Sequence, residues 1–475
     1  MTEHGRAQYL IGGEWITPPG DGVAVIDPYT EQRIGEVAES GPEAVHAAVS
    51  AADKALTNWS DTPVEERVAM LDRVADDLDR DRDRIAELVS REMGMPLALS
   101  RVTQSELPAS VLRATAQLAR QFPWSQKIDG ATLERGAAGV VAAITPWNFP
   151  IHQIVAKVAA ALAAGCTVVL KPSEMTPFDA NALASLFLEA GCPRGVLNTV
   201  TGTGPITGAA LAAHPGLGHV SFTGSVGAGR AVAGLAAHTL TRCTLELGGK
   251  SPALLLPDAD LDTAVAGAIS SGLVNSGQAC NATSRILVPV DALADVESLV
   301  HKHIERYTLG DPSDSGTRLG PLASQRQRNR VLGYIADAVE AGGTLLTGSG
   351  KPSQISEHGY FVDPTVITGL PEDAQAVREE IFGPVIVIQT YTNTDDAVRL
   401  ANDCDYGLSA EIWSTDVDEA KTVASRLHAG QVKINGVRTR SRPAVPFGGR
   451  KNSGYGRELG TLGLEEFTEV RAVMA

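Results

Sequence analysis

The chain has 475 residues and a formal net charge of -16 at pH 7, because 56 acidic residues outnumber 40 Lys and Arg residues. This length exceeds one ordinary hydrophobic core, so we expect two or more domains. The acidic balance argues against nucleic acid and anionic membranes as partners, since both require clusters of cations. The first residues, MTEHGRAQYLIGGEW, lack the pattern of a secretory signal, and the apolar stretch 154–170 is too short and too interrupted to span a bilayer.

Cysteine usage points to a reducing compartment. The five cysteines are scattered and form no CxxC pair, which argues against a disulfide framework and against a zinc site. We therefore expect a cytoplasmic protein with no bound metal. The cysteines are Cys166, Cys192, Cys243, Cys280 and Cys404.

The first quarter of the chain, residues 42–121, is predicted to be mostly helical. Apolar residues recur at three- and four-residue steps through PVEERVAMLDRVADDLDRDRDRIAELVSREMG, with Pro63 at its start and Gly94 at its stop. Two short strands around Asp129-Gly130 then predict a hairpin over 124–137. An isolated hairpin is marginal in water, so this segment predicts contact with another subunit, in a homodimer or homotetramer.

Beyond the hairpin, short apolar segments alternate with alanine-rich helical segments. This alternation predicts an α/β fold with a mostly parallel sheet covered by helices. Five strands are expected first, at 140–145, 167–170, 195–200, 218–222 and 242–247. A second series of strands and helices follows and includes ILVPV, PVIVIQTY and QVKIN. We predict a cofactor domain over 1–123 and 138–248, a catalytic domain over 249–448, and an assembly element formed by 124–137 and the tail 449–475.

Cys280 lies in the segment NSGQACNATSR, whose residues are small and polar. A free cysteine usually packs as a small apolar residue, and a structural cysteine is the alternative interpretation. A thiolate is a strong nucleophile, and small neighbours leave room for a substrate. The segment therefore favours Cys280 as a nucleophile.

Two further motifs carry polar groups at the ends of predicted strands. Glu246 in LELGGKSP is either a solvent-facing strand end or a partly desolvated general base. Asn148 in TPWNFP either belongs to a rigid turn or donates an amide N–H to a developing oxyanion. In an open α/β sheet, ligands bind at this end of the strands.

The candidates for dinucleotide binding are weaker. In KPSE, Glu174 follows the second predicted strand and is placed to accept hydrogen bonds from ribose hydroxyls, with Lys171 close to it in sequence. TGTGPITG does not match GxGxxG. FTGSVGAG places Ser225 and several glycines where a helix begins, and such a helix start can hold a pyrophosphate.

Together these motifs resemble the aldehyde dehydrogenase superfamily over nearly the whole chain. The matching segments occur in the family's order and spacing, and LELGGKSP followed by GQAC is highly specific. The segments are PWNFP, KPSE, FTGS, LELGGKSP, GQAC, EEIFGP, PFGG and NSGYGRE. The resemblance implies the aldehyde dehydrogenase-like fold, with a Rossmann-like cofactor domain, a catalytic domain and a small β element for oligomerisation. It also implies NAD-dependent oxidation of an aldehyde to a carboxylic acid.

The resemblance implies roles residue by residue. Cys280 forms a thiohemiacetal and then a thioester, and Glu246 activates the water that hydrolyses the thioester. Asn148 and the backbone N–H of Cys280 stabilise the oxyanion, and Lys157 helps to relay the proton. The residues implied to bind the cofactor are Thr145, Pro146, Trp147, Lys171, Ser173, Glu174, Gly204, Phe222, Thr223, Gly224, Ser225, Gly227, Leu247, Glu380 and Phe382. Glu174 predicts a preference for NAD over NADP, because a carboxylate repels a 2′-phosphate.

Three alternatives share parts of this pattern. A thiol hydrolase needs a histidine partner, and no histidine lies in the motifs around Cys280 or Glu246. A non-catalytic protein of the same fold is expected to lose one of the catalytic residue types. A CoA-acylating dehydrogenase keeps the cysteine and has no need of Glu246. An assay with an aldehyde and NAD, with and without CoA, separates them.

The aldehyde is the least determined part of the function. By resemblance, the substrate tunnel is lined by His152, Gln153, Ala156, Asn281, Arg440 and Phe447. His152 and Gln153 are polar and Ala156 is small, which suggests that the tunnel is wider and more hydrated than the tunnel of relatives that take aliphatic aldehydes. Arg438, Arg440 and Arg442 alternate before PFGG and would favour an aldehyde that bears a carboxylate or another polar group. The alternative is that these arginines pair with acidic residues at a subunit contact and that the substrate is a general medium-sized aldehyde.

Overall fold

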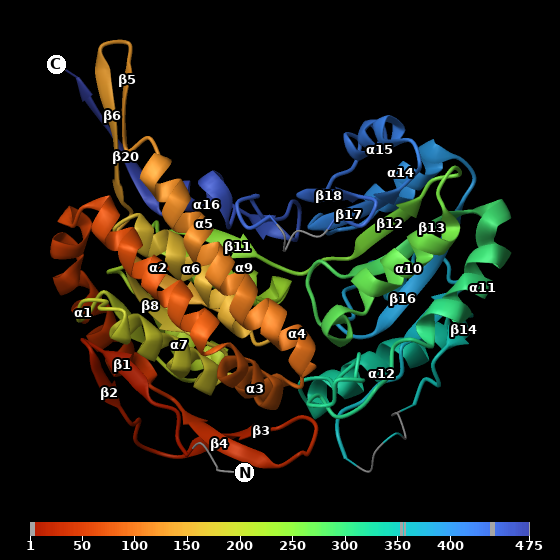
Figure 1. The fold of residues 1–475 in the computed structure, drawn as a ribbon, viewed down its shortest axis with the longest axis horizontal. Coiled ribbons are helices and arrows are strands. Elements are labelled where there is room, and N and C mark those ends of the chain that lie inside the picture. The colour runs from red at the N-terminus through yellow and green to blue at the C-terminus, as the bar shows by residue number, and fades with distance from the viewer. Residues whose placement is uncertain (1–4, 352–354, 356–357, 438–441, 475) are drawn as a thin grey trace.

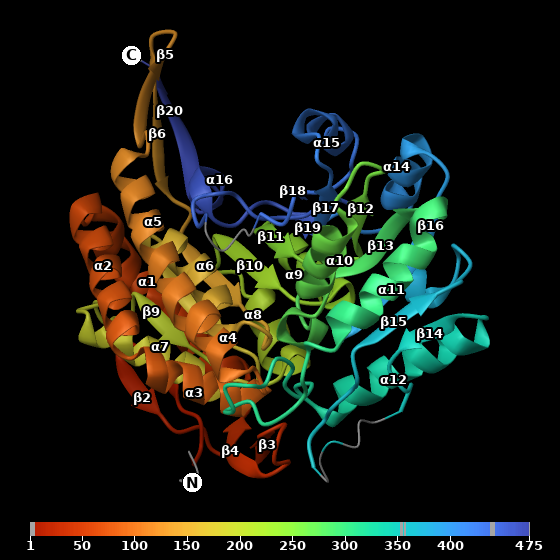
Figure 2. The same ribbon diagram turned by 45° about the vertical axis from the view of Figure 1, so that its right-hand side comes forward.

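A computed structural model describes residues 5–351, 355, 358–437 and 442–474. Two large sheets lie in two halves of the molecule, and a small third sheet projects from the first half (Figures 1 and 2). Helices cover both large sheets, as the alternation of apolar and helical segments predicted. In the part of the chain that is described, no helix is both long enough and apolar enough to cross a bilayer.

The N-terminal part begins with strands that the sequence analysis did not predict. They are β1 (Tyr9–Ile11), β2 (Glu14–Ile16), β3 (Gly22–Ile26) and β4 (Arg33–Ala38), paired as two antiparallel ribbons. The predicted helices follow as α1 (Gly41–Asp61), α2 (Val64–Arg80), α3 (Arg82–Met93), α4 (Leu97–Arg101) and α5 (Leu107–Gln121), with a π-helical turn over Val102–Glu106. Gly94 ends α3 in the left-handed conformation with φ 80°, as its position at the predicted stop indicated.

The first large sheet has the order β19-β11-β10-β7-β8-β9 and is parallel except for β19. Its strands are β7 (Val140–Ile144), β8 (Thr167–Lys171), β9 (Leu197–Thr199), β10 (His219–Thr223), β11 (Arg242–Glu246) and β19 (Gly454–Tyr455). The five predicted strands are confirmed. Helices α6 (Pro150–Ala163), α7 (Pro177–Glu189), α8 (Ala209–Ala212) and α9 (Val226–Ala237) lie between them, and a π-helical turn spans Gly204–Gly208. The strand order reverses between β7 and β10, and ligands bind at such a reversal.

The second large sheet has the order β14-β15-β16-β13-β12-β17-β18, with β14 as its antiparallel edge. Its strands are β12 (Ser251–Leu255), β13 (Thr283–Pro289), β14 (Thr344–Thr347), β15 (Thr365–Thr368), β16 (Val385–Tyr391), β17 (Ser409–Trp413) and β18 (Gln431–Ile434). Its helices are α10 (Leu261–Gly272), α11 (Leu293–Ile304), α12 (Gln325–Glu340), α13 (Gln375–Arg378), α14 (Thr394–Asn402) and α15 (Val417–Ala424), with 3-10 turns over Val274–Gly277 and Val290–Ala292. The strands predicted from ILVPV, PVIVIQTY and QVKIN are confirmed as β13, β16 and β18.

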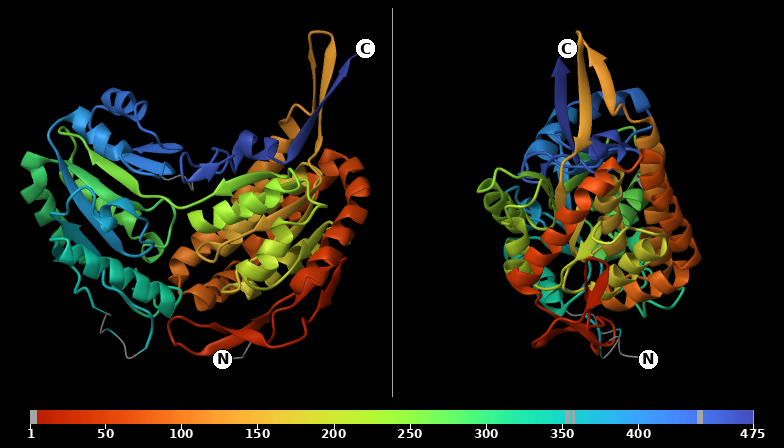
Figure 3. Two further views of the ribbon diagram at one scale, coloured as in Figure 1. Left: turned by 180° about the vertical axis from the view of Figure 1, so that it is seen from behind. Right: turned by 90° about the vertical axis from the view of Figure 1, so that its left-hand side faces the viewer.

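The third sheet consists of β5 (Ser125–Ile128), β6 (Ala131–Ala137) and β20 (Thr468–Met474) and stands away from the body (Figure 3). β20 pairs with β6 of the same chain from Thr468 opposite Ala137 to Met474 opposite Ala131. The earlier part of the tail lies elsewhere: β19 joins the first large sheet, and α16 (Gly460–Glu465) packs on α5 and α6. Gly454 permits this approach, because a Cβ there would lie 1.9 Å from the Leu245 carbonyl oxygen.

Candidate active site

Cys280 follows a turn whose backbone is unusual. Asn275, Ser276 and Gly277 are all left-handed, with φ of 51°, 55° and 72°. A left-handed residue other than glycine costs about 1–2 kcal/mol, so the turn requires support. Ser276 Oγ donates to the Gly320 carbonyl at 2.7 Å, and a Cβ on Gly277 would lie 2.0 Å from the Gly383 carbonyl oxygen. The nucleophile therefore sits on a turn that its surroundings hold in place.

Asn148 connects the end of β7 to this turn. Its Nδ2 donates to the Gln278 carbonyl at 3.0 Å, and Asn275 Nδ2 donates to the Asn148 carbonyl at 3.0 Å. An amide nitrogen carries two N–H groups, so one donor remains after the bond to Gln278. The predicted oxyanion donor and the predicted nucleophile are thus tied together by hydrogen bonds between two loops.

The surroundings of Cys280 keep its thiol protonated. Burial is the largest cause, and the carboxylates of Glu380, Glu246 and Glu458 add to it, which together raise the pKa of Cys280 to about 12. The thiolate is the nucleophilic form of cysteine. Attack therefore requires that a base take the thiol proton or that a positive charge approach the sulfur.

Glu246 is the last residue of β11 and is 2% exposed. Neither of its carboxylate oxygens has a hydrogen-bond partner among the described residues. Burial first, and then the negative charge of Glu458, raise the pKa of Glu246 well above its usual range, while Lys157 and Arg457 oppose the shift. Such a carboxylate suits a general base that works near neutral pH.

Lys157 lies fully buried on α6 and forms an ion pair with Glu458. Its Nζ also donates to Thr223 Oγ1 at 2.6 Å. Glu458 was not predicted as a site residue, although it is the final residue of the NSGYGRE segment that carried part of the resemblance. Because Glu458 affects the pKa of both Cys280 and Glu246, it belongs to the same site.

A cavity of about 820 Å³ opens at the strand reversal between β7 and β10 and reaches Cys280. Most residues predicted to bind the cofactor line it: Pro146, Trp147, Ser173, Glu174, Thr223, Gly224, Ser225, Gly227, Leu247, Glu380 and Phe382. Thr145, Lys171, Gly204 and Phe222 lie outside its wall. Lys171 supports the wall, because its Nζ donates to Glu174 Oε2 at 3.4 Å.

The cavity fits a dinucleotide. Ser225 caps α9 with its Oγ, which accepts from the Ala228 N–H at 3.3 Å, and no atom lies within 4 Å of a Cβ placed on Gly227. A helix start with open space in front of it binds phosphate through its N–H groups and dipole. Glu174 and Glu380 lie on the same wall, and carboxylates in such a position can accept hydrogen bonds from ribose hydroxyls.

The loop that carries Glu380 and Phe382 is fixed by residues of α12 that the sequence analysis did not identify. Arg330 donates to the Glu380 carbonyl at 2.7 Å, and Gln327 Nε2 donates to the Phe382 carbonyl at 2.7 Å. Phe382 also packs edge-on against Trp147, with ring centroids 5.5 Å apart. Polar residues on an amphipathic helix give no sequence signal of such a role.

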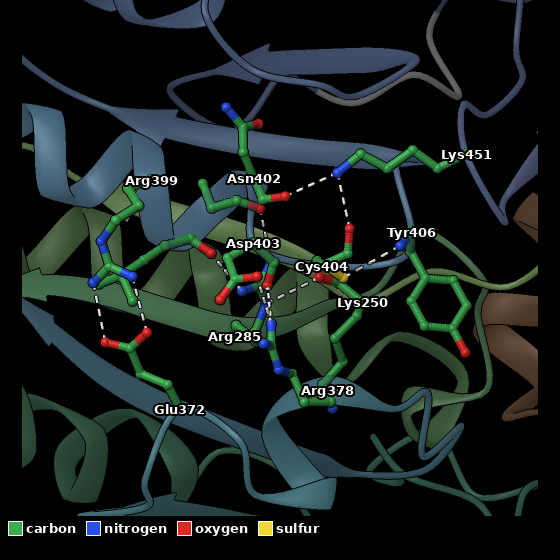
Figure 4. Close-up of polar contacts among 12 residues, drawn as sticks. Lys250, Arg285, Glu372, Arg378, Arg399, Asn402, Asp403, Cys404, Tyr406 and Lys451 are labelled. Atoms are coloured by element: carbon green, nitrogen blue, oxygen red, sulfur yellow. Dashed lines mark hydrogen bonds and ion pairs between the residues drawn. The ribbon is translucent and has the colours of Figure 1, made fainter.

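Two buried basic side chains, Lys250 just before β12 and Arg285 on β13, lie close together (Figure 4). Arg285 donates to the carbonyls of Lys250, Leu400 and Ala401 at 3.1, 2.9 and 3.0 Å. Lys250 Nζ has no hydrogen-bond partner among the described residues, and burial followed by the charge of Arg285 lowers the pKa of Lys250 to about 7. This pair fixes the start of β12, just after the Gly-Gly pair that follows Glu246.

A second cavity of about 410 Å³ also reaches Cys280. Its wall contains every described residue predicted for the substrate tunnel: His152, Gln153, Ala156, Asn281 and Phe447. Arg442 is exposed and lines the same cavity, whereas Arg438 and Arg440 lie outside the described residues. Burial, and then the charge of Lys157, lower the pKa of His152 to about 4, so this imidazole is neutral at pH 7.

Comparison with known proteins agrees with this geometry. The model of the aldehyde dehydrogenase family matches residues 15–473. The chain is 43% identical over 470 residues to 3-succinoylsemialdehyde-pyridine dehydrogenase of a Pseudomonas species, which covers 98% of both chains. It is 41% identical to a crystallised mutant of aldehyde dehydrogenase C from Pseudomonas syringae in complex with NAD+ and octanal, with a TM-score of 0.97 and coverage of 98% and 96%.

A third comparison is with a Mycobacterium tuberculosis aldehyde dehydrogenase crystallised with NAD+. The identity is 38% and the TM-score 0.96, and the match covers 99% of this chain and 98% of the other. The chain described here belongs to the aldehyde dehydrogenase family. The fold class expected from the motifs is thereby confirmed.

Proposed function

We propose that this aldehyde dehydrogenase uses NAD to oxidise an aldehyde to a carboxylic acid through a thioester on Cys280, which water activated by Glu246 then hydrolyses. One observation carries the proposal: two cavities with different linings meet at Cys280, and Glu246 lines one of them. The Pseudomonas syringae relative was crystallised with NAD+ and octanal, which supports a site that takes a dinucleotide and an aldehyde.

In the first half of the proposed reaction, Glu246 takes the proton of the Cys280 thiol, the proton leaves through Lys157 and Glu458, and Cys280 Sγ then adds to the aldehyde carbon. The remaining N–H of Asn148 and the backbone N–H of Cys280 stabilise the resulting oxyanion. NAD, when bound in the larger cavity, supplies the acceptor for the hydride that leaves this carbon. The product on the protein is a thioester on Cys280.

In the second half, Glu246 takes a proton from water, and the oxygen of that water attacks the thioester carbon. The carbon–sulfur bond breaks and the carboxylic acid leaves. Lys157, paired with Glu458, supports this step by holding positive charge beside the base and by relaying its proton. Glu246 favours this hydrolytic course over acyl transfer to CoA, which needs no base for water.

The test is a pair of substitutions at these two residues. Glu246→Gln should release one NADH per site in a burst and then stall with a thioester in place, whereas Cys280→Ser should lose nearly all turnover. Electrospray mass spectrometry of the stalled protein detects the acyl group. Undiminished steady-state rates in either variant, or a strict requirement for CoA, would contradict the mechanism.

The cofactor proposal includes a preference for NAD over NADP. Glu174 is on the wall of the larger cavity, where a carboxylate accepts bonds from ribose hydroxyls and repels a 2′-phosphate. Lys171 contacts the same carboxylate, so NADP is expected to be used less well rather than excluded.

Assembly into a homodimer or homotetramer is also proposed. The three-stranded sheet stands away from the body and exposes apolar side chains of β5 and β20, among them Ile128, Val470, Val473 and Met474. An exposed apolar ribbon of this kind is typical of a contact surface, because isolated small sheets are marginal in water. The subunit contact is therefore expected at this sheet.

A further inference from the structure

The substrate cavity has a polar wall that the proposed reaction does not use. Gln431 and Lys433 alternate on β18, and Glu411 and Trp413 alternate on β17, so each pair lies on one face of its strand. Lys433 is directly opposite Glu411 in the register of these parallel strands. All four residues line the cavity that reaches Cys280.

Helix α10 packs against β17 and contributes to the same part of the cavity wall. Thr263, Gly267 and Ser271 follow one another at four-residue steps, so they share one face of the helix. Gly267 makes room for the Trp413 ring, because a Cβ there would lie 2.1 Å from the ring. The wall therefore combines small residues of α10 with long side chains of β17 and β18.

The polar groups of this wall are desolvated and only partly satisfied. Lys433 Nζ lies 2.5 Å from Glu411 Oε1, and Ser271 Oγ donates to the same oxygen at 2.6 Å. Glu411 Oε2, Gln431 Oε1 and Trp413 Nε1 are buried and have no hydrogen-bond partner among the described residues. Buried polar atoms without partners cost free energy, so the cavity favours a ligand that completes these bonds.

The unsatisfied groups include both acceptors and donors of hydrogen bonds. Glu411 Oε2 and Gln431 Oε1 accept hydrogen bonds, whereas Trp413 Nε1–H and the remaining N–H groups of Lys433 donate them. The Lys433–Glu411 ion pair is neutral as a whole, and Arg442, which also lines the cavity, is exposed, so a carboxylate bound at these four residues would face Glu411 without a buried cation of its own. A hydroxyl or a primary amide both donates and accepts, and it brings no charge.

We propose that the wall formed by Gln431, Lys433, Glu411 and Trp413 is a recognition subsite for aldehydes whose far end carries an uncharged hydrogen-bonding group, such as a hydroxyl or a primary amide. The inference rests on the proposed function, because the aldehyde group is taken to lie at Cys280. It assigns these four residues to substrate selection rather than to the reaction itself.

The test compares 7-hydroxyheptanal with octanal, which has the same number of non-hydrogen atoms, and adds 7-oxoheptanoate as the charged competitor. In the parent enzyme, kcat/KM should be highest for the hydroxy aldehyde. In Lys433→Met combined with Glu411→Leu, kcat/KM for octanal should rise, and the ratio of hydroxy aldehyde to octanal should fall by about ten- to a hundredfold, as expected for hydrogen bonds to charged groups.

The matched control removes an exposed ion pair of the same kind, with Lys421→Met combined with Asp418→Leu on α15. This control should leave the ratio unchanged. Trp413→Phe keeps an aromatic ring but removes the indole N–H together with part of the ring, so its ratio should fall by about two- to tenfold. This variant tests the subsite even if the double variant fails to fold.

Binding of inert alcohols separates failure of the subsite from failure of the proposed function. Calorimetry should show that 1,7-heptanediol binds the parent enzyme more tightly than 1-octanol does, and that the double variant reverses this order. A ratio that stays within twofold of the parent value in both Trp413→Phe and the double variant would overturn the inference. So would a preference for 7-oxoheptanoate that depends on Lys433. Tight diol binding without NADH formation would instead refute only the proposed reaction.

Discussion

Glu458→Gln is expected to shift the pH dependence of thioester hydrolysis to lower pH. In the parent enzyme, Glu458 neutralises Lys157 and its charge raises the pKa of Glu246. The substitution removes this negative charge and leaves the buried ammonium of Lys157 without its partner. Both changes favour the ionised form of Glu246, so its pKa must fall.

The size of the shift follows from the arrangement of charges. Among the charges that act on Glu246, Glu458 has the largest effect, larger than the opposing effect of Lys157, and the substitution removes only the effect of Glu458. A nearby opposite charge lowers the pKa of a carboxyl by about 1–3 units, and one unit corresponds to about 1.4 kcal/mol. We therefore expect a fall of at least about one unit in the pKa of Glu246.

The sign of the rate effect follows because a general base must be ionised. Hydrolysis slows as pH falls through the pKa of Glu246, so a lower pKa moves this acid limb of the profile to lower pH. The plateau at higher pH should fall, since a weaker base accepts the proton from water less readily. The variant should thus be slower at pH 8 and keep a larger share of its own maximum at pH 6.

The assay follows NADH formation between pH 5 and 9 after a burst of one NADH per site has shown that hydrolysis limits the steady state. Glu465→Gln is the control, because its carboxylate is not among the charges that shift the pKa of Glu246. An acid limb that stays in place, or that moves to higher pH, would refute the assignment of Glu246 and Glu458 to one charge network.

Four further results are expected. Gly277→Ala should lower kcat at least about a hundredfold, because its Cβ would lie 2.0 Å from the Gly383 carbonyl oxygen and would displace the nucleophile. The control Gly333→Ala on α12, where space is open, should leave kcat unchanged. Lys250→Met should raise the thermal midpoint more at pH 7 than at pH 10. Burial lowers the pKa of Lys250 from 10.5 to about 7, so between these two pH values the folded protein must give up a proton that the unfolded chain keeps, and the resulting loss of folding stability disappears as pH rises towards 10.5. Equal gains in the midpoint at both pH values would contradict this reasoning. Glu174→Gln should lower the NAD-to-NADP ratio of kcat/KM. An unchanged ratio would show that this carboxylate does not cause the preference for NAD. Light scattering at micromolar concentration should give a multiple of the chain mass, and a monomer would count against assembly.

Much of the fold could be predicted because its strands are buried on both faces. Continuous apolar segments such as 140–145 and 167–170 gave strands β7 and β8. Strands β1 to β4 were missed because each gives a short or interrupted pattern. β1 and β2 have only three residues each, and β3 and β4 mix exposed positions with buried ones.

The site residues also fall into those that could be found from the sequence and those that could not. Residues of compact motifs, such as Cys280 and Glu246, could be found because their neighbours in sequence are also their neighbours in the site. Glu458 could not, since its contact with Lys157 joins residues 301 positions apart. The pairing of Lys433 with Glu411 depends on the register of two parallel strands, which the apolar pattern of β17 and β18 does not specify.

The meeting of two cavities at one sulfur has a consequence for how such an enzyme can diversify. Among the described residues, Gln153 and Cys280 are the two that line both cavities. The wall positions on β17, β18 and α10 line only the smaller cavity, so an exchange there acts directly on the aldehyde alone. Cofactor preference and aldehyde preference are for this reason separable traits. A laboratory library confined to β17, β18 and α10 can explore new aldehydes while the dinucleotide site stays intact.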